Sequence, residues 1–548
     1  MRILLINPGQ LPDAGEDQFA GRMDSMFLRG RPFSETYFGI PLALPTLAGV
    51  TPAPHEVRIL DEMVEPIDFD QPCDLVGLSA MTCKATRAYQ IASEFRRRGV
   101  RVVIGGIHAS MCPDEAARHV DAVVVGEAEE LWPGLLADAE RGRLAPRYVA
   151  DAFPDVKTLP PPRHDLTPYT RYFSYFLQTT RGCPRSCSFC TVTKMNGRRL
   201  RRKTPQQVVD EVARAITLPN PWRPTIVDRE RGDRKRKVAG GAIFFVDDNF
   251  AIDREHALAV CRALTAYQDE HDLHLNWFTQ SDLTAGFDDE LLAAMKEAGC
   301  MNIFMGFESL HPEALAAMHK PVNLPDRYRE CIDNVERHGI EVTMSVIVGT
   351  DSETASAGED MARFARDNHV FYLFPNIMTP HPGTQLMSEL EAEGRILRRE
   401  PELYNIRNVV FRPKLMAAAE LQSLYANLCR DVLDMGRLLE TAALKVKRPK
   451  RYYLTRPWRL LIWLAFSYFF VVLGLRRKLT FREVGKLLRY APRLVLRNGS
   501  LNALGFVVNA VGFGTFSRNE ARRLAKPEQP GVASDAPSRA RAIQAPKP

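Results

Sequence analysis

Three cysteines in one short segment constrain this chain more than any other feature of its sequence. Cys183, Cys187 and Cys190 follow one another at spacings of four and three residues, so a single loop can bring three thiolates around one small group. Zinc is the first alternative, but a structural zinc site takes four protein ligands. No Cys or His follows at a spacing that completes a tetrahedron. Three thiolates suit a cubane iron–sulfur cluster whose fourth iron stays open to a ligand from outside the protein.

The residues on either side of the cysteines indicate a strand, the loop and then a helix. Residues 173–180 are aromatic and β-branched and end directly at the loop, as a strand would. Residues 204–216 start with Thr and Pro and continue with apolar residues at a spacing near 3.6, which predicts a helix. With Phe189 before its last cysteine, the CxxxCxxC loop resembles the signature of the radical S-adenosylmethionine (radical SAM) enzymes. The resemblance implies a [4Fe-4S] cluster on the three cysteines, S-adenosylmethionine (SAM) chelated by the open iron, and Phe189 packed on the adenine side.

Length and composition predict a largely folded protein of several modules. At 548 residues the chain is too long for one ordinary core. Its 45% apolar and 25% charged residues are typical of a globular protein. The first eight residues read as a strand and a turn, not as a secretory signal. Reduced thiols and an oxygen-sensitive cluster predict a cytoplasmic location.

The net charge of +7 is distributed unevenly. Residues 445–500 carry fifteen Lys or Arg against one acid, Glu483, a local charge of +14 that leaves −7 for the rest of the chain. A nucleic-acid-binding body is not expected from this distribution, whereas a basic appendage on an acidic enzyme is.

The first 137 residues alternate between predicted strands and helices. The strands are expected at residues 2–7, 56–61, 74–79, 100–104 and 121–126, and the helices at 42–50 and 82–98. Such alternation predicts a doubly wound parallel sheet that binds its ligand at the carboxyl ends of the strands. The residues that we expect to contact a cofactor there are Ser79, Thr82, Gly105, Gly106, His108, Gly126 and Glu127.

A generic nucleotide-binding sheet would show the same alternation. The residue sequence of the loops, with Gly-Gly-Ile-His at 105–108 and Gly-Glu-Ala-Glu at 126–129, instead resembles the cobalamin-binding domain that precedes many radical SAM barrels. The sequence departs from that domain in having no Asp-x-His-x-x-Gly, so no lower axial His is supplied. The resemblance then implies either cobalamin bound without a protein imidazole or a domain that has lost the cofactor. His108 would face the corrin, or it is an ordinary surface histidine.

After a Pro-rich linker at 138–170, the chain from 171 to 400 predicts a partial (β/α)6 barrel. Strands after the first are expected at 242–246, 273–278, 302–305, 341–348 and 370–374, with helices such as 288–298 and 325–338 between them. Residues 219–240 are dense in charge and predict a solvated surface insertion. Polar residues at the strand ends place the active site on the carboxyl face of the barrel.

Each of these strand ends matches a position that binds SAM in radical SAM enzymes. By the resemblance, Asp247 and Asp248 would lie near the methionine amine, where a carboxylate is electrostatically favourable. Gln280 and Glu308 end neighbouring strands, and Glu308 resembles the acid that binds the ribose. The strand from Ser345 to Gly349 would pair with the adenine. The reaction implied is reductive cleavage of SAM to a 5′-deoxyadenosyl radical; methyl transfer follows if cobalamin is present, and cyclisation, coupling or oxidation if it is absent.

Beyond residue 400 the sequence predicts a helical extension to 516 and a disordered tail at 517–548. Residues 460–475 form an uncharged run with basic flanks, shorter than the roughly 20 residues that span a bilayer. We expect an interfacial helix on an anionic membrane surface, beside a second apolar run at 501–516. A buried helical hairpin is the alternative.

Together these features predict a cytoplasmic radical SAM enzyme that acts at the membrane surface. Its expected partners are a hydrophobic or lipid substrate, such as a polyisoprenoid, and a one-electron donor such as flavodoxin or ferredoxin. Two other interpretations stay open: an enzyme that modifies a soluble natural product or peptide, and a non-catalytic iron–sulfur membrane adaptor.

Overall fold

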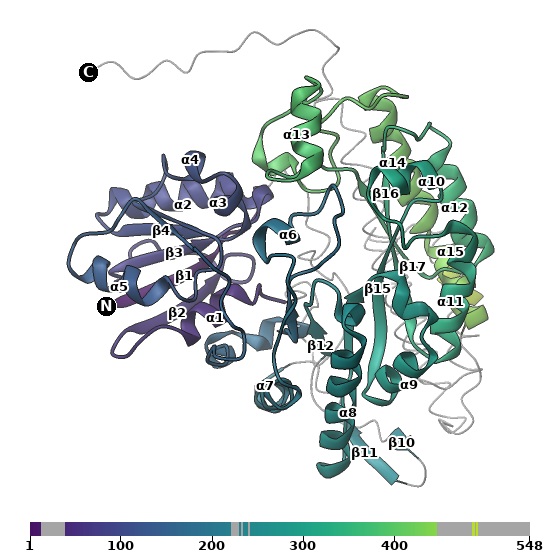
Figure 1. The fold of residues 1–548 in the computed structure, drawn as a ribbon, viewed down its shortest axis with the longest axis horizontal. Coiled ribbons are helices and arrows are strands. Elements are labelled where there is room, and N and C mark those ends of the chain that lie inside the picture. Colours follow the sequence, from purple (N-terminus) through teal and green to yellow (C-terminus); the bar gives the residue numbers. More distant parts are fainter. Residues whose placement is uncertain are drawn as a thin grey trace.

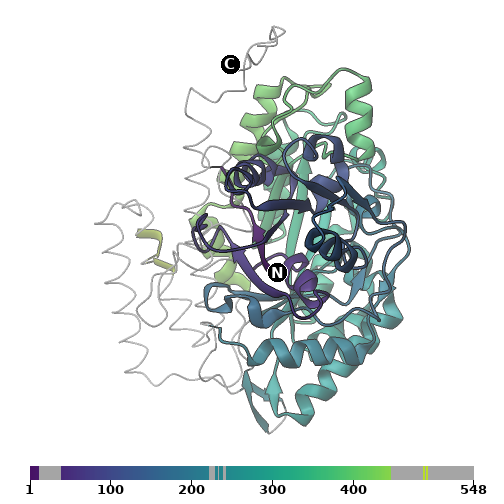
Figure 2. The ribbon, with the colours of Figure 1, turned by 90° about the vertical axis from the view of Figure 1, so that its left-hand side faces the viewer.

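Two parallel sheets side by side dominate the computed structural model (Figure 1). The structure describes residues 1–11, 39–220, 229–231, 234–238, 242–445, 485–487 and 489–490. Seen from the side, the first sheet lies in front of the second (Figure 2). The segments expected at 460–475, 501–516 and 517–548 fall outside the described residues.

The first sheet has six parallel strands in the order β2-β1-β3-β4-β5-β6. Its strands are β1 (Arg2–Asn7), β2 (Glu56–Asp61), β3 (Leu75–Ser79), β4 (Arg101–Gly105), β5 (Ala122–Val125) and β6 (Arg147–Val149). Alternate strand residues bury opposite faces, which is why helices cover both sides. Leu4, Val76 and Val102 pack with the apolar face of α2 (Ala85–Arg97). Ile3, Leu5 and Val103 share the other core with α1 (Ala43–Gly49) and α5 (Trp132–Glu140), so the predicted doubly wound domain is confirmed.

The second sheet is the partial barrel, with six parallel strands in the order β17-β16-β15-β14-β12-β7. Its strands are β7 (Ser174–Leu177), β12 (Ala242–Phe245), β14 (Trp277–Ser281), β15 (Cys300–Glu308), β16 (Glu341–Val348) and β17 (Tyr372–Ile377). The main helices between them are α7 (Pro205–Thr217), α8 (Arg254–Glu270), α9 (Asp289–Glu297), α11 (Tyr328–Arg337) and α12 (Ala357–Asp367). The chain order of the strands is their spatial order, as the predicted (β/α)6 architecture requires.

Three local expectations differ from the structure. The third barrel strand, expected at 273–278, is β14 at Trp277–Ser281, because the Leu275 N–H donates to the Gln268 side chain at 2.9 Å and so leaves the strand ladder. Residues 273–274 form β13, which pairs with β11 (Arg234–Val238) of the charged insertion. That insertion forms a hairpin of β10 (Arg229–Arg231) and β11. In the expected linker, β6 extends the first sheet.

The described chain after the barrel is helical. Helix α13 (Gln385–Ala392) follows β17, α14 (Ala418–Val432) packs on α12 and β17, and α15 (Met435–Lys445) follows α14. Within the described ranges, every helix is too short or too polar to cross a bilayer.

Candidate functional site

The cysteine loop is framed by a two-stranded ribbon and anchored to the barrel. Strand β8 (Thr180–Arg181) leads into the loop, α6 (Val192–Met195) follows it, and β9 (Arg201–Arg202) returns antiparallel to β8. The Cys183 N–H donates to the Gly197 carbonyl at 3.1 Å, and the Ser188 N–H donates to the Met318 carbonyl at 3.2 Å. The loop of three cysteines is therefore held at its start and in its middle.

The three thiols lie near one another without converging on one point. Burial raises the pKa of all three, that of Cys190 to about 12, and the Cys187 charge raises the pKa of its two neighbours further. Four ligands of one zinc ion lie about 3.8 Å apart, given a bond length of about 2.3 Å. Among the described residues, the only metal-ligand group within 4.8 Å of one another is elsewhere, at His108, Cys112 and Glu115. Sulfurs spaced more widely fit a cluster in which each thiolate binds a different iron.

Asp247 and Asp248 follow the same strand but have different surroundings. The Asp247 carboxylate is fully buried and accepts hydrogen bonds from the N–H and hydroxyl groups of Thr179 and Thr180, at 2.5–3.2 Å. Burial raises the Asp247 pKa, and these hydrogen bonds oppose the rise. Asp248 accepts from the Gly182 N–H at 3.1 Å and from the Asn196 amide at 3.2 Å, beside the cysteine loop. The structure thus uses Asp247 to join β7 to β12, and it gives Asp248 the position nearer to the cluster.

Glu308 ends β15 in a strained backbone conformation. Its φ is +61°, and the register of β15 against β16 shifts between Gly306 and Glu308. Such strain in a non-glycine residue persists only where the surroundings enforce it. The Glu308 carboxylate forms an ion pair with Lys320 at 2.8 Å, and both side chains are largely buried. Although burial opposes it, the charges of Glu308 and Cys187 raise the Lys320 pKa, so a cation is held beside the cysteine loop.

The remaining predicted SAM contacts lie on the same face of the barrel. Gln280 is within β14 on the face opposite the helix-packed Trp277 and Thr279. Ser345 accepts from the Asn376 amide at 3.2 Å. Gly349 has a φ of +97°, and its N–H donates to Glu353 at 2.9 Å. Phe189 is partly buried against the main core.

The carboxyl edge of the first sheet carries three glycines, Gly105, Gly106 and Gly126, which we call the glycine edge. Gly106 has a φ of +88°, and a Cβ there would lie 2.9 Å from Ser79 Oγ. Gly126 has a φ of +89°, and its N–H donates to Ser110 Oγ at 3.0 Å. Gly105 ends β4, and Thr82 is buried at the start of η3 (Thr82–Lys84). Side-chain-free backbone at this edge fits the close approach of a large cofactor.

Two residues predicted to contact that cofactor are engaged elsewhere. His108 lies in α3 (Ile107–Met111) and is 1% exposed, with Nε2 2.9 Å from the Tyr89 hydroxyl and 3.4 Å from Glu115. These contacts, to α2 and to α4 (Pro113–Ala116), give no support to a corrin-facing His108. Glu127 is bound by two arginines of the β8–β9 ribbon.

Sequence reasoning missed three polar groups of the site. Lys320 is one. Arg185, inside the cysteine loop, donates to Asp282 at 2.6 Å. Glu353 is 2% exposed and accepts from the Ser309 hydroxyl at 2.6 Å as well as from Gly349. Only the place of Arg185 between the cysteines could have drawn attention to it in the sequence.

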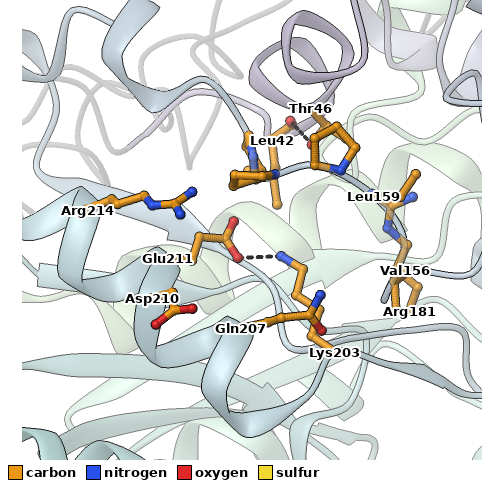
Figure 3. A pocket seen from close by; sticks show the side chains of 13 residues that line it. Leu42, Thr46, Val156, Leu159, Arg181, Lys203, Gln207, Asp210, Glu211 and Arg214 are labelled. Atoms are coloured by element: carbon orange, nitrogen blue, oxygen red, sulfur yellow. Dashed lines mark hydrogen bonds and ion pairs between the residues drawn. The ribbon is translucent and has the colours of Figure 1, made fainter.

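A small pocket lies at the junction of α1, residues 156–162 and α7 (Figure 3). The Lys203 amine forms an ion pair with Glu211 in its wall. Arg181 is its one lining residue from the segment that carries the cysteines. None of the three cysteines lines this pocket, so it is separate from the proposed cluster site.

Comparisons with known proteins agree with this geometry. Residues 177–365 match the radical SAM superfamily, and residues 35–136 match the B12 binding domain. The protein is thus a radical SAM enzyme with a cobalamin-binding domain. It is 30% identical over 68% of the chain to bacteriochlorophyllide d C-8(2)-methyltransferase of Chlorobaculum tepidum, covering 80% of that protein. The chain belongs to the cobalamin-dependent radical SAM methyltransferase family.

Two further similarities extend the comparison. Hopanoid C-2 methylase of Rhodopseudomonas palustris is 29% identical, and the match covers 67% of each chain. The fold is similar to the structure of the radical SAM methyltransferase TsrM from Kitasatospora setae with cobalamin and a [4Fe-4S] cluster bound. The TM-score is 0.56 at 16% identity, over 79% of this chain and 88% of that one.

The residues present fit these cofactors. Cys183, Cys187 and Cys190 would hold the cluster, and the glycine edge of the first sheet would hold cobalamin. When bound, the cluster supplies the electron that cleaves SAM, and cobalamin supplies a carrier for the methyl group. The protein anchors the cysteine loop, holds a cation and a carboxylate beside it, and places the two cofactor edges close together.

Proposed function

We propose that this enzyme methylates an unactivated carbon of a hydrophobic, ring-containing substrate bound inside the barrel. In this reaction the substrate C–H hydrogen passes to the 5′-deoxyadenosyl radical, giving 5′-deoxyadenosine. A methyl group from a second SAM, which leaves S-adenosylhomocysteine, takes its place on the carbon, and the one-electron donor supplies the electrons. One observation carries the substrate class: a belt of phenylalanines on the inner face of the barrel.

The belt consists of one phenylalanine from each of five strands. Its members are Phe176, Phe244, Phe278, Phe304 and Phe374. Their strand neighbours Leu177, Phe245 and Trp277 belong to the core under the helices, so by alternation the belt faces the barrel interior.

The rings of the belt contact one another across the sheet. Phe244 stacks on Phe278 with centroids 4.7 Å apart, and Phe176 meets Phe244 edge-on at 5.2 Å. Phe304 and Phe374 are 5.7 Å apart. Aromatic rings beneath the polar strand ends provide an apolar surface suited to flat or polycyclic carbon skeletons.

The names of two relatives agree with this class, since one acts on a bacteriochlorophyllide and the other on a hopanoid. We extend the proposal to SAM, which Glu308, Lys320, Gln280 and the Ser345–Gly349 strand would contact. We also propose that a one-electron donor reduces the cluster, and that the enzyme attaches to an anionic membrane surface in the cytoplasm. Membrane pelleting that survives high salt would support the last part.

The test uses anaerobically reconstituted protein, a chemical reductant and SAM with a deuterated methyl group. A hopanoid and a bacteriochlorophyllide serve as substrate probes, and mass spectrometry follows label transfer and 5′-deoxyadenosine. We expect F278A to keep 5′-deoxyadenosine formation but to lose at least about tenfold in label transfer, as for a lost apolar contact of 1–3 kcal/mol. L324A, which removes an exposed leucine, is the matched control. Equal transfer by F278A and wild type would contradict the belt's role.

A further inference from the structure

A buried ion-pair cluster joins the cobalamin-binding domain to the cysteine loop. Arg181 Nη1 donates to Glu127 Oε2 at 2.7 Å and to Glu129 Oε1 at 2.5 Å. Arg201 Nη1 donates to Glu127 Oε2 at 2.8 Å, and Arg201 Nη2 donates to Glu127 Oε1. We call Glu127, Arg181 and Arg201 the Glu127 clamp.

The clamp is fixed at both ends by the backbone. Arg181 and Arg201 are antiparallel partners in the β8–β9 ribbon, so their guanidinium groups approach one carboxylate from neighbouring strands. Arg201 also donates to the Pro154 carbonyl at 3.0 Å and to the Asn196 carbonyl at 2.9 Å. On the other side, Glu127 directly follows Gly126, at the carboxyl end of β5.

The clamp lies out of water, where a charge pair is costly to break. The side chain of Glu127 is 4% exposed, and those of Arg181 and Arg201 are 13% and 10% exposed. Removing one member of such a pair leaves an uncompensated buried charge. Both oxygens of Glu127 are already bonded to arginines, so its carboxylate is committed to the clamp and not to a cofactor.

The position of the clamp gives it a role beyond holding two domains together. Arg181 is two residues before Cys183, and Glu127 directly follows Gly126 of the glycine edge. A change in the separation of the two cofactor loops must therefore stretch this contact. Reactions that need close alignment lose roughly 100-fold for a displacement of about 1 Å.

We propose that Glu127 is a positioning residue that fixes the distance between the cobalamin and the iron–sulfur cluster through Arg181 and Arg201. The inference rests on the proposed function for its two cofactors, but it is independent of the substrate. Loss of the clamp lets the cofactors adopt a range of separations while each loop still binds its own cofactor.

The test measures that separation directly. Protein loaded with hydroxocobalamin and cluster is reduced so that cobalt and cluster are both paramagnetic, and pulsed electron paramagnetic resonance gives the distance distribution between them. We expect one narrow distribution in wild type and one at least twice as wide in E127Q and in R201Q. The double variant should be no wider than E127Q, because E127Q already removes the Glu127–Arg201 ion pair; the Arg181–Glu129 pair is kept in all three variants.

Matched controls separate positioning from folding. D114N breaks the exposed Arg147–Asp114 pair in the same domain and should keep the narrow distribution. R201K retains a charge but not the two-pronged contact, and should give an intermediate width even where E127Q folds poorly. Iron, sulfide and corrin content are measured in every sample.

Two outcomes would overturn the inference: unchanged widths in E127Q and R201Q that carry both cofactors, or widening that adds up in the double variant. The absence of methylated product in the substrate assay would refute the proposed function. It would leave the distance measurement standing.

Discussion

Asp247 gives the sharpest test of how the strand-end acids are used. Its position after β12 predicts contact with SAM, whereas the structure buries it against Thr179 and Thr180. Replacement by Asn keeps the shape and Oδ1, which accepts from both threonines, but puts an amide at Oδ2, which now shares the Thr179 N–H with Oδ1 at 3.1 Å and 3.2 Å. The variant D247N therefore leaves an amide N–H without an acceptor in a site that water does not reach.

The magnitude follows from counting the buried donors left without a partner. One unsatisfied buried N–H costs about 1–3 kcal/mol, which corresponds to an opening of the β7–β8 junction that is about 5–150 times more frequent. Replacement by Ala removes the acceptor of four donors, the N–H and hydroxyl groups of both threonines, and the two N–H groups alone should cost about 2–6 kcal/mol. Burial raises the Asp247 pKa, so both replacements also relieve a buried charge. This relief offsets part of the lost stability, and for each variant we expect a cost in the lower half of its range.

Hydrogen–deuterium exchange at residues 179–182 measures this opening, and equilibrium dialysis measures SAM affinity on the same samples. D247N should speed local exchange by the factor above, with cluster content falling as the junction opens. The control is D288N, which keeps an N-cap oxygen for α9 but removes the charge that pairs with Arg254, and it should leave residues 179–182 unchanged. Weaker SAM binding by D247N with unaltered exchange would refute this reasoning and return Asp247 to the ligand site.

Two further predictions concern groups near the carboxyl face. Burial lowers the His381 pKa to about 4, so this imidazole stabilises the fold fully above its ordinary pKa of 6.5 and progressively less as the pH falls towards 4. Between pH 7 and pH 5 the free energy of unfolding should fall by about 2 kcal/mol because of His381. Urea denaturation of H381Q should show that this fall has disappeared. An equal pH dependence in wild type and H381Q would show that His381 is not its cause. K320M leaves the buried Glu308 carboxylate unpaired and should cost about 3–5 kcal/mol of stability. Thermal denaturation should show recovery in K320M/E308Q without recovery of SAM binding, and full binding by that double variant would exclude Lys320 from the site.

Local patterns predicted the fold and the cysteine loop, because each depends on neighbouring residues. The buried run of β1 and the Thr204–Pro205 start of α7, with its capping box, are both present as expected. Side-chain partners were harder to predict because they are distant in the chain. The sequence shows that Asp247 and Asp248 follow a strand, but it does not show that Asp247 binds Thr179 and Thr180 while Asp248 binds Gly182. Glu127 and Arg201 are 74 positions apart in the chain, so no local sequence pattern predicts their ion pair. The ion pair of Lys320 with Glu308 has no local sequence pattern either.

The acids at the strand ends share a task that explains why so many of them are buried. A loop that wraps a cluster cannot bond its own backbone as a helix or sheet does, so its N–H groups need acceptors from elsewhere. Asp247 serves Thr179 and Thr180, Asp248 serves Gly182, and Glu127 neutralises the arginines on either side. These carboxylates come from strands of both sheets and meet at one ribbon. These charges therefore first build the loop. Glu308, which is paired with Lys320 beside Cys187, remains the acid that we propose for SAM.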